Sequence, residues 1–127
     1  MILLDTSAVI LLLRGESPPT GLIHETIGLS SVVEMELWTG VFHGGGKKEQ
    51  LRVASFLNKT QVFAFDQQAA KQTARVTAEL WSAGTPIGDF DVQIAGHALS
   101  LKRPLLSHNA KHFQRVSGLE LIPWDGD

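Results

Sequence analysis

The feature that most constrains this chain is an alternation of short apolar runs with longer helical segments. Short apolar runs bounded by polar or turn residues are typical of buried parallel strands. They predict strands at 2–4, 27–30, 61–65, 105–107 and 119–122. The intervening segments predict helices at 6–14, 21–26, 32–43, 47–58, 67–83, 89–101 and 110–116, several of which end at glycine or proline. Strands that alternate with helices imply a mostly parallel central sheet covered by helices on both faces.

The length and composition fit one α/β domain over residues 1–127. The chain has 127 residues, of which 43% are hydrophobic, enough for one globular core. It has no cysteine, which excludes a disulfide framework and thiolate zinc sites and fits a reducing cytoplasm. The apolar start is interrupted at Asp5 with no basic segment before it, so it is not a signal peptide. The longest apolar run, 8–13, is too short to cross a bilayer. We therefore expect a cytoplasmic protein with no membrane partner.

The charge of the chain does not by itself indicate nucleic-acid binding. The formal net charge is −2 and the pI is about 6.2, whereas a basic protein would attract nucleic acid through its charge alone. If the chain acts on RNA, a bound divalent cation and local Lys/Arg patches must offset the repulsion.

Asp5 follows the first predicted strand directly. In parallel α/β sheets, ligands bind outside the carboxyl ends of the strands, and Ser107 lies at the end of another predicted strand. A carboxylate in this place can hold a hard cation, but Asp5 can equally cap the helix that begins there. Thr6 or Ser7 could supply the cap instead, so both roles for Asp5 remain open.

Glu34 and Glu36 lie on one predicted helix, about 200° apart around its axis, so only one of them can face a site. Ser31 and Glu34 match the S-x-x-E capping box, in which the glutamate bonds back to the start of the helix. This gives Glu34 a structural role and makes Glu36 the candidate ligand. The alternative for Glu36 is a solvated surface residue.

Asp89 and Asp91 lie where another helix begins, and they are more acids than one cap requires. Asp89 suits the N-cap, and Asp91 would then point inward. If these carboxylates converge with Asp5 and Glu36, they raise one another's pKa unless a cation sits among them. Oxygen-only ligation favours Mg²⁺ or Mn²⁺, which can activate a water for attack on a phosphodiester. The five histidines do not form a convincing metal site.

Four stretches resemble the motifs of PIN domains, specifically of VapC-type toxins. They are MILLDTS at 1–7, LSSVVEMELWTG at 29–40, PIGDFDVQIAGHAL at 86–99, and LLSHNAKHF at 105–113 followed by VSGL at 116–119. Trp124 matches a frequent terminal tryptophan. The resemblance spans nearly the whole chain in the right order, which makes it more specific than any single motif.

This resemblance implies a three-layer α/β/α PIN-like fold and a Mg²⁺- or Mn²⁺-dependent endoribonuclease that forms a homodimer and is inhibited by a cognate VapB-type antitoxin. It places Asp5, Glu36 and Asp91 on the family's metal-binding acids and Asp89 on a position that is often acidic. Three further residues fall on central polar positions: Thr6, Ser107 and Asn109. Where many relatives carry an acid in the fourth motif, this chain has Asn109 and His112. Whether Asp89, Asn109 or His112 completes the site, and whether it holds one metal or two, stays open.

An antitoxin tail would need a cation for the carboxylates and a groove for its apolar anchors. Arginine suits the first because its planar fork pairs bidentately with carboxylates. The candidate groove lies between the early helices, with apolar surface from Leu11, Leu37, Trp38, Val41 and Phe42. The alternative is that these residues are core or dimer contacts.

Two other functions fit part of the pattern. A degenerate PIN-like domain would bind RNA or protein without cutting. An aspartate-dependent phosphatase would use Asp5 as a nucleophile, although a haloacid-dehalogenase-like enzyme needs an aspartate where Ser7 stands. A metal-dependent cleavage assay separates these functions.

Overall fold

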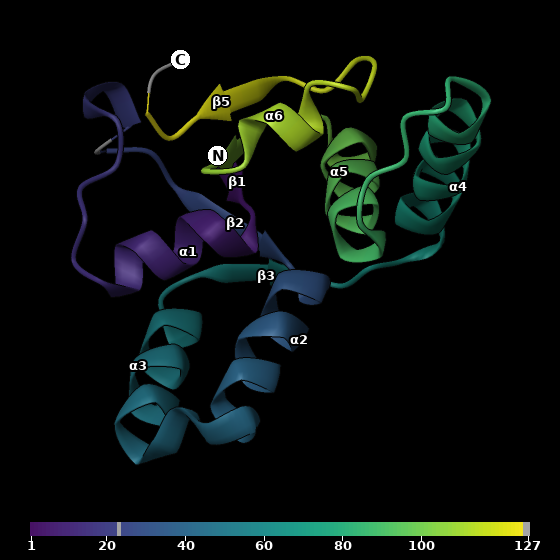
Figure 1. The fold of residues 1–127 in the computed structure, drawn as a ribbon. Helices are drawn as coiled ribbons and strands as arrows, with labels where there is room; N and C mark the ends of the chain where they lie inside the picture. Colours follow the sequence, from purple (N-terminus) through teal and green to yellow (C-terminus); the bar gives the residue numbers. More distant parts are fainter. Residues whose placement is uncertain (23, 126–127) are drawn as a thin grey trace.

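A computed structural model describes residues 1–22 and 24–125 of the chain. Its centre is a five-stranded parallel sheet in the order β3-β2-β1-β4-β5 (Figure 1). The strands are β1 (Ile2–Leu4), β2 (Ile27–Ser30), β3 (Gln61–Phe63), β4 (Leu105–Ser107) and β5 (Leu121–Pro123). β1, β2 and β4 contribute leucines to the core, including Leu4, Leu29 and Leu105, which are at most 1% exposed. The apolar runs of β1, β2 and β4 are therefore buried strands, as predicted, whereas β3 and β5 at the two edges of the sheet are only partly buried.

Helices flank this sheet, which confirms the predicted α/β architecture (Figure 1). They are α1 (Thr6–Leu13), α2 (Ser31–Gly40), α3 (Gly46–Asn58), α4 (Gln67–Ser82), α5 (Asp89–Leu101) and α6 (Ala110–Phe113). A π-helical segment (Val41–Gly45) joins α2 to α3. α1, α2 and α3 lie together, whereas α4 and α5 lie side by side. Gly96 permits this close pairing, since a Cβ there would lie 2.6 Å from the Thr73 Cα.

The structure corrects several predicted boundaries. The helix expected at 21–26 is wrong for the described part: a 3-10 turn (Thr20–Leu22) precedes residue 23, which lies outside the described residues, and 24–26 are not helical. Six residues are too few for a helix without strong tertiary support. The helix expected at 32–43 begins at Ser31 and leaves α-geometry after Gly40.

The ends of two strands and of the last helix also differ from the prediction, and the strand ends follow the pairing with neighbouring strands. The strand expected at 61–65 stops at Phe63, the last residue paired with β2. The strand expected at 119–122 runs instead from Leu121 to Pro123, in register with β4. The helix expected at 110–116 ends at Phe113. Local patterns cannot show which residues of a neighbouring strand are available for pairing.

The strand order predicts a ligand site at the carboxyl ends of the two central strands β1 and β4. From β1 the chain proceeds to β2 and β3 on one side, and later places β4 and β5 on the other. The direction therefore reverses between β1 and β4, and such a switch point leaves a crevice at the carboxyl ends of the strands. Asp5 follows β1 and Ser107 ends β4, so both flank this crevice.

None of the helices formed by the described residues is long and apolar enough to cross a membrane.

Candidate active site

Asp5 lies at the switch point and is 2% exposed. Its Oδ1 accepts hydrogen bonds from the Ala8 amide (2.9 Å) and the Ser7 hydroxyl (2.8 Å), so it caps α1. Its Oδ2 accepts a hydrogen bond from Ser107 Oγ across the β1–β4 crevice (2.6 Å). Burial raises the pKa of Asp5, these hydrogen bonds lower it, and the charge of Asp91 raises it further. The two roles left open by the sequence, cap and site carboxylate, are compatible in one residue.

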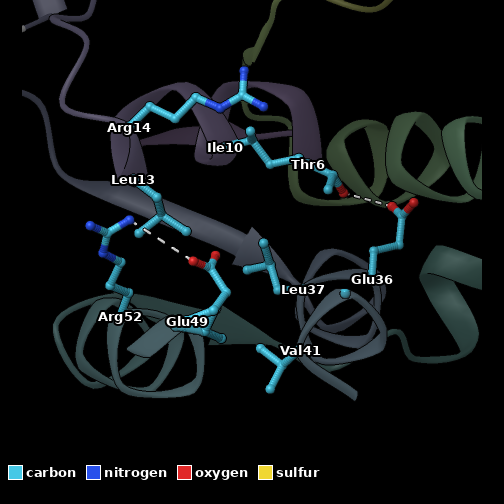
Figure 2. A pocket seen from close by; sticks show the side chains of 11 residues that line it. Thr6, Ile10, Leu13, Arg14, Glu36, Leu37, Val41, Glu49 and Arg52 are labelled. Atoms are coloured by element: carbon cyan, nitrogen blue, oxygen red, sulfur yellow. Dashed lines mark hydrogen bonds and ion pairs between the residues drawn. The ribbon is translucent and has the colours of Figure 1, made fainter. Parts of the chain in front are cut away.

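Glu36 is held on the side of α2 that faces Asp5. The hydroxyl of Thr6 donates to its Oε1 at 2.6 Å, joining the start of α1 to α2 (Figure 2). Burial also raises the pKa of Glu36, opposed by the Thr6 hydrogen bond and reinforced by the charges of Asp91 and Asp5. The side of α2 chosen from the sequence is thus the side that meets the other acids.

Asp91 completes the group from the first turn of α5. Its side chain is 29% exposed, and its Oδ2 lies 3.5 Å from the Nδ1 of His112 on α6. The sequence left open whether His112 completes the site, and the structure places its imidazole beside Asp91, 21 positions away on a different helix. His112 therefore stands beside the acids as a neighbour of Asp91 rather than as part of a histidine cluster.

The three acids form an oxygen-donor set from β1, α2 and α5. Within residues 1–22 and 24–125, however, no group of three or more His, Asp or Glu side chains has an arrangement that would hold a metal ion. Instead, Glu36 accepts a hydrogen bond from the Thr6 hydroxyl and Asp5 accepts one from the Ser107 hydroxyl. The imidazole of His112 lies beside Asp91. The donor chemistry itself suits Mg²⁺ or Mn²⁺, and a cation would offset the burial and the neighbouring charge that raise the pKa of Asp5 and of Glu36.

The structure places the remaining candidates less centrally. Asp89 is exposed and lines a small cavity of about 50 Å³ toward α4, and its charge is not among those that raise the pKa of Asp5 or Glu36. The expected capping by Asp89 is wrong, because the N-cap of α5 is Gly88. The amide of Asn109 donates to Ser107 Oγ at 2.8 Å, while its side chain is exposed. Asn109 thus supports Ser107 through its backbone.

The predicted capping box is also wrong. Ser30, not Ser31, caps α2 by accepting from the Val32 amide at 3.1 Å. Ser31 Oγ accepts instead from the amide of Phe65, and Glu34 accepts from the indole of Trp38 at 3.2 Å. Glu34 still has a structural role on the opposite side of α2 from Glu36, but with a different partner.

Sequence reasoning missed a buried histidine behind the site. His97 on α5 is 1% exposed, and its Nδ1 lies 2.7 Å from Ser30 Oγ. Burial lowers its pKa, opposed by the charge of Asp66. This bond joins the helix that carries Asp91 to the cap of the helix that carries Glu36. A histidine within the apolar side of a predicted helix was the one available signal.

Comparisons with known proteins bear on this arrangement. The PIN domain family model matches residues 2–119. A tRNA(fMet)-specific endonuclease VapC from Salmonella typhimurium is 35% identical over 97 residues, covering 76% of this chain and 74% of the relative. Ribonuclease VapC1 from Haemophilus influenzae is 30% identical, with 96% of each chain covered.

Solved structures of VapBC complexes are similar to this chain as well. A chain from the DNA-bound VapBC complex of Salmonella typhimurium superposes with a TM-score of 0.87 at 30% identity, covering 97% of both chains. A chain from the VapBC2 complex of Rickettsia felis bound to a promoter DNA fragment also gives 0.87, at 29% identity, covering 98% of this chain and 100% of the other. The family match, the relatives and the shared fold agree, and the chain belongs to the PIN-domain family as a VapC-type ribonuclease.

Proposed function

We propose that this chain is an endoribonuclease that uses Mg²⁺ or Mn²⁺ and serves as the toxin of a VapBC toxin–antitoxin pair. The observation that carries the proposal is the approach of Asp5, Glu36 and Asp91 at the switch point, where burial raises the pKa of the first two and the charge of Asp91 raises both further. Similarity to proteins named VapC ribonucleases supports RNA as the substrate. A bound cation would offset the repulsion between a polyanion and a chain of net charge −2.

The three carboxylates would hold the ion, which when bound supplies an activated water and stabilises the leaving oxygen. Ser107 and Ser7 fix Asp5, and Thr6 fixes Glu36, so that each carboxylate has one defined direction. Asp91 would exchange the nearby imidazole of His112 for the ion. Asn109 supports the site by orienting Ser107, whereas Asp89 borders the cavity toward α4 and is not assigned a role in holding the ion.

The test is cleavage of a labelled RNA pool by the full chain with Mg²⁺, with Mn²⁺ and with EDTA. We expect cleavage only with added metal, and its loss in Asp91→Asn, which removes charge while keeping volume. Glu16→Gln is the control, since Glu16 is exposed and lies outside the three-acid group. RNA binding without cleavage would support the degenerate binding module instead, and turnover of phosphate monoesters the phosphatase.

The proposed partner is a VapB-type antitoxin, supported by the VapBC complexes among the similar structures. A cavity of about 350 Å³ lies between α1, α2 and α3 and is bordered by Thr6 and Glu36 (Figure 2). Its apolar lining includes Ile10, Leu13, Leu37 and Val41. A peptide seated there could therefore extend a basic side chain to the carboxylates.

Only part of the apolar lining predicted for this groove is confirmed. Leu37 and Val41 line the cavity, but Leu11 is 7% exposed and belongs to the core. Trp38 and Phe42 stack on each other with ring centroids 6.1 Å apart, and neither lines the cavity. Phe42 is 81% exposed, so it remains available to a partner outside the groove.

The antitoxin proposal is tested with the cognate antitoxin and its tail peptide. We expect the peptide to inhibit cleavage, and replacement of its basic residue by alanine to restore activity more than it weakens binding. Inhibition that is indifferent to that residue contradicts the mechanism. The homodimer implied by the family belongs to the same proposal and is tested by light scattering on the purified toxin.

A further inference from the structure

A second cavity, of about 330 Å³, adjoins the carboxylates on the β4–β5 side of the sheet. Its walls come from the segment 107–112 and from residues 123–125. We propose that this cavity is a subsite for the sugar–phosphate backbone of RNA next to the bond that is cut, with Lys111 as its principal phosphate contact. The proposal rests on the proposed ribonuclease function and assigns the path of the substrate beyond the three acids.

The cavity and the acid site share residues, which places the subsite one step along the strand from the carboxylates. Ser107 borders the cavity and donates to Asp5 Oδ2 at 2.6 Å. His112 borders it as well, and its Nδ1 is 3.5 Å from Asp91 Oδ2. An RNA strand with one phosphodiester at the carboxylates therefore continues into this cavity without crossing another element.

The two cavities beside the acids differ in their polar groups, and the donors of the second cavity fit a phosphate backbone. In the groove between α1, α2 and α3, Arg14 and Arg52 are balanced by Glu36 and Glu49. In the second cavity the one carboxylate of the lining is Asp125, and it pairs with His108 at 3.4 Å. The donors of this lining are the ammonium of Lys111, the imidazole of His112 and the side-chain amide of Asn109. Phosphate oxygens are the acceptors such donors favour.

The aromatic wall of the cavity argues for backbone contact rather than base recognition. Trp124 is 8% exposed and packs in the core, so its ring offers no open face on which a base could stack. Proteins hold single-stranded nucleic acid through stacking of bases on aromatic rings and through grooves of cations that follow the phosphates, and this cavity offers mainly the second kind of contact. The subsite should therefore strengthen RNA binding without selecting a sequence.

The experiment measures RNA binding separately from cleavage. A fluorescein-labelled single-stranded RNA is titrated with the Glu36→Gln chain, in which cleavage is expected to be lost, and anisotropy is recorded from 0.05 to 0.2 M salt. Adding Lys111→Ala should weaken binding about fivefold near 0.1 M salt, because one contact to single-stranded phosphate contributes about 0.7 to the slope of log K against log salt. Lys111→Glu should weaken it further. Lys71→Ala is the matched control, an exposed lysine on α4 that borders neither cavity.

In the otherwise unchanged enzyme, Lys111→Ala should raise KM and leave kcat unaltered, since the contact is made equally before and during reaction. Equal RNA affinity of Lys111→Ala and Lys71→Ala, in a chain that does cut RNA, overturns the subsite and leaves the ribonuclease function standing. A loss confined to one RNA sequence overturns the backbone assignment. Absence of both RNA binding and cleavage in the wild-type chain rejects the ribonuclease function, and the subsite with it.

Discussion

Asp5 combines a structural and a chemical role in one carboxylate. One oxygen caps α1 and the other meets Ser107 across the crevice, while burial raises the pKa of the group. The charged form is therefore held at a cost to folding that the hydrogen bonds only partly offset. This combination explains why capping alone, which any Ser, Thr, Asp or Asn could supply, does not account for an aspartate in this place.

Asp5→Asn should abolish cleavage while leaving the metal-free melting temperature unchanged or raised. The amide oxygen can still accept from Ala8 and Ser7, and the penalty of a buried charge disappears. Cleavage at ordinary Mg²⁺ and thermal melts in EDTA measure the two effects. Wild-type cleavage by this variant contradicts the site, and a large drop in melting temperature would show that the cap requires the charge.

The two glutamates of α2 should separate activity from stability. Glu36→Gln should lose cleavage with little change in melting temperature. Glu34→Ala should keep cleavage and cost about 0.5–1.5 kcal/mol, since it removes the acceptor of the Trp38 indole, a bond of ordinary net strength. Denaturant melts and RNA cleavage on both variants provide the comparison. If activity depended on Glu34 instead, the assignment of the two sides of α2 would have to be reversed.

The capping-box error shows what the sequence cannot decide at the scale of residues. Ser30 and Ser31 both fit a helix start, and the choice depends on where β2 ends and on the distant Phe65 amide that engages Ser31. The link between His112 and Asp91 is likewise formed by packing of α6 on α5. By contrast, Asp5 could be chosen from local pattern, because a strand end is a local property. Glu36 was chosen through the capping box, and it lies on the expected side of α2 although that box does not form.

At the scale of elements, His97 connects the helices that carry the acids. Its bond to Ser30 fixes α5 against the start of α2, and burial lowers its pKa. The unfolded chain therefore takes up a proton at a higher pH than the folded chain does. The contribution of neutral His97 to the free energy of unfolding is fully present above its ordinary pKa of about 6.5. This contribution is lost as the pH falls through the lower pKa that His97 has in the folded chain.

His97→Asn should remove this part of the pH dependence. Its amide can replace Nδ1 as the partner of Ser30, and it does not titrate in this range. Melting temperatures from pH 7.5 to 5 should fall more steeply for wild type than for the variant, although the smaller side chain lowers the variant's overall stability. Identical slopes would contradict a neutral buried His97. Asp66, whose charge raises the pKa of His97, opposes the effect, and Asp66→Asn should steepen the wild-type slope.

Elements were predicted better than their ends. All five strands and the helices α1 to α5 follow from periodicity and turn residues, because each has enough apolar spacing to be specified locally. The segment 21–26 and the short α6 were overestimated, since their form depends on what they pack against. The tight pairing of α4 and α5 through Gly96 and Thr73 was not visible either, because it depends on two helices meeting.

At the scale of the whole molecule, the fold brings the carboxylates of Asp5, Glu36 and Asp91 together at the carboxyl ends of the central strands. Burial, and then the charge of Asp91, raise the pKa values of Asp5 and Glu36. A raised carboxyl pKa means that the folded chain binds these protons more tightly than the unfolded chain. Stability therefore falls as the pH rises through the folded pKa values, and the loss persists at neutral pH.

A divalent cation that binds this cluster should reverse the loss. An ion that binds only the folded chain stabilises it by about 2.7 kcal/mol at a hundred times its dissociation constant, which corresponds to a rise in melting temperature on the order of 10 °C for a domain of this size. We expect this rise with Mg²⁺ or Mn²⁺ relative to NaCl of equal ionic strength, measured by calorimetry without RNA. It should shrink as the pH is lowered, because protons compete for the same oxygens, and it should be small in Asp91→Asn. A rise of the same size in Asp91→Asn would assign the ion to a different part of the protein.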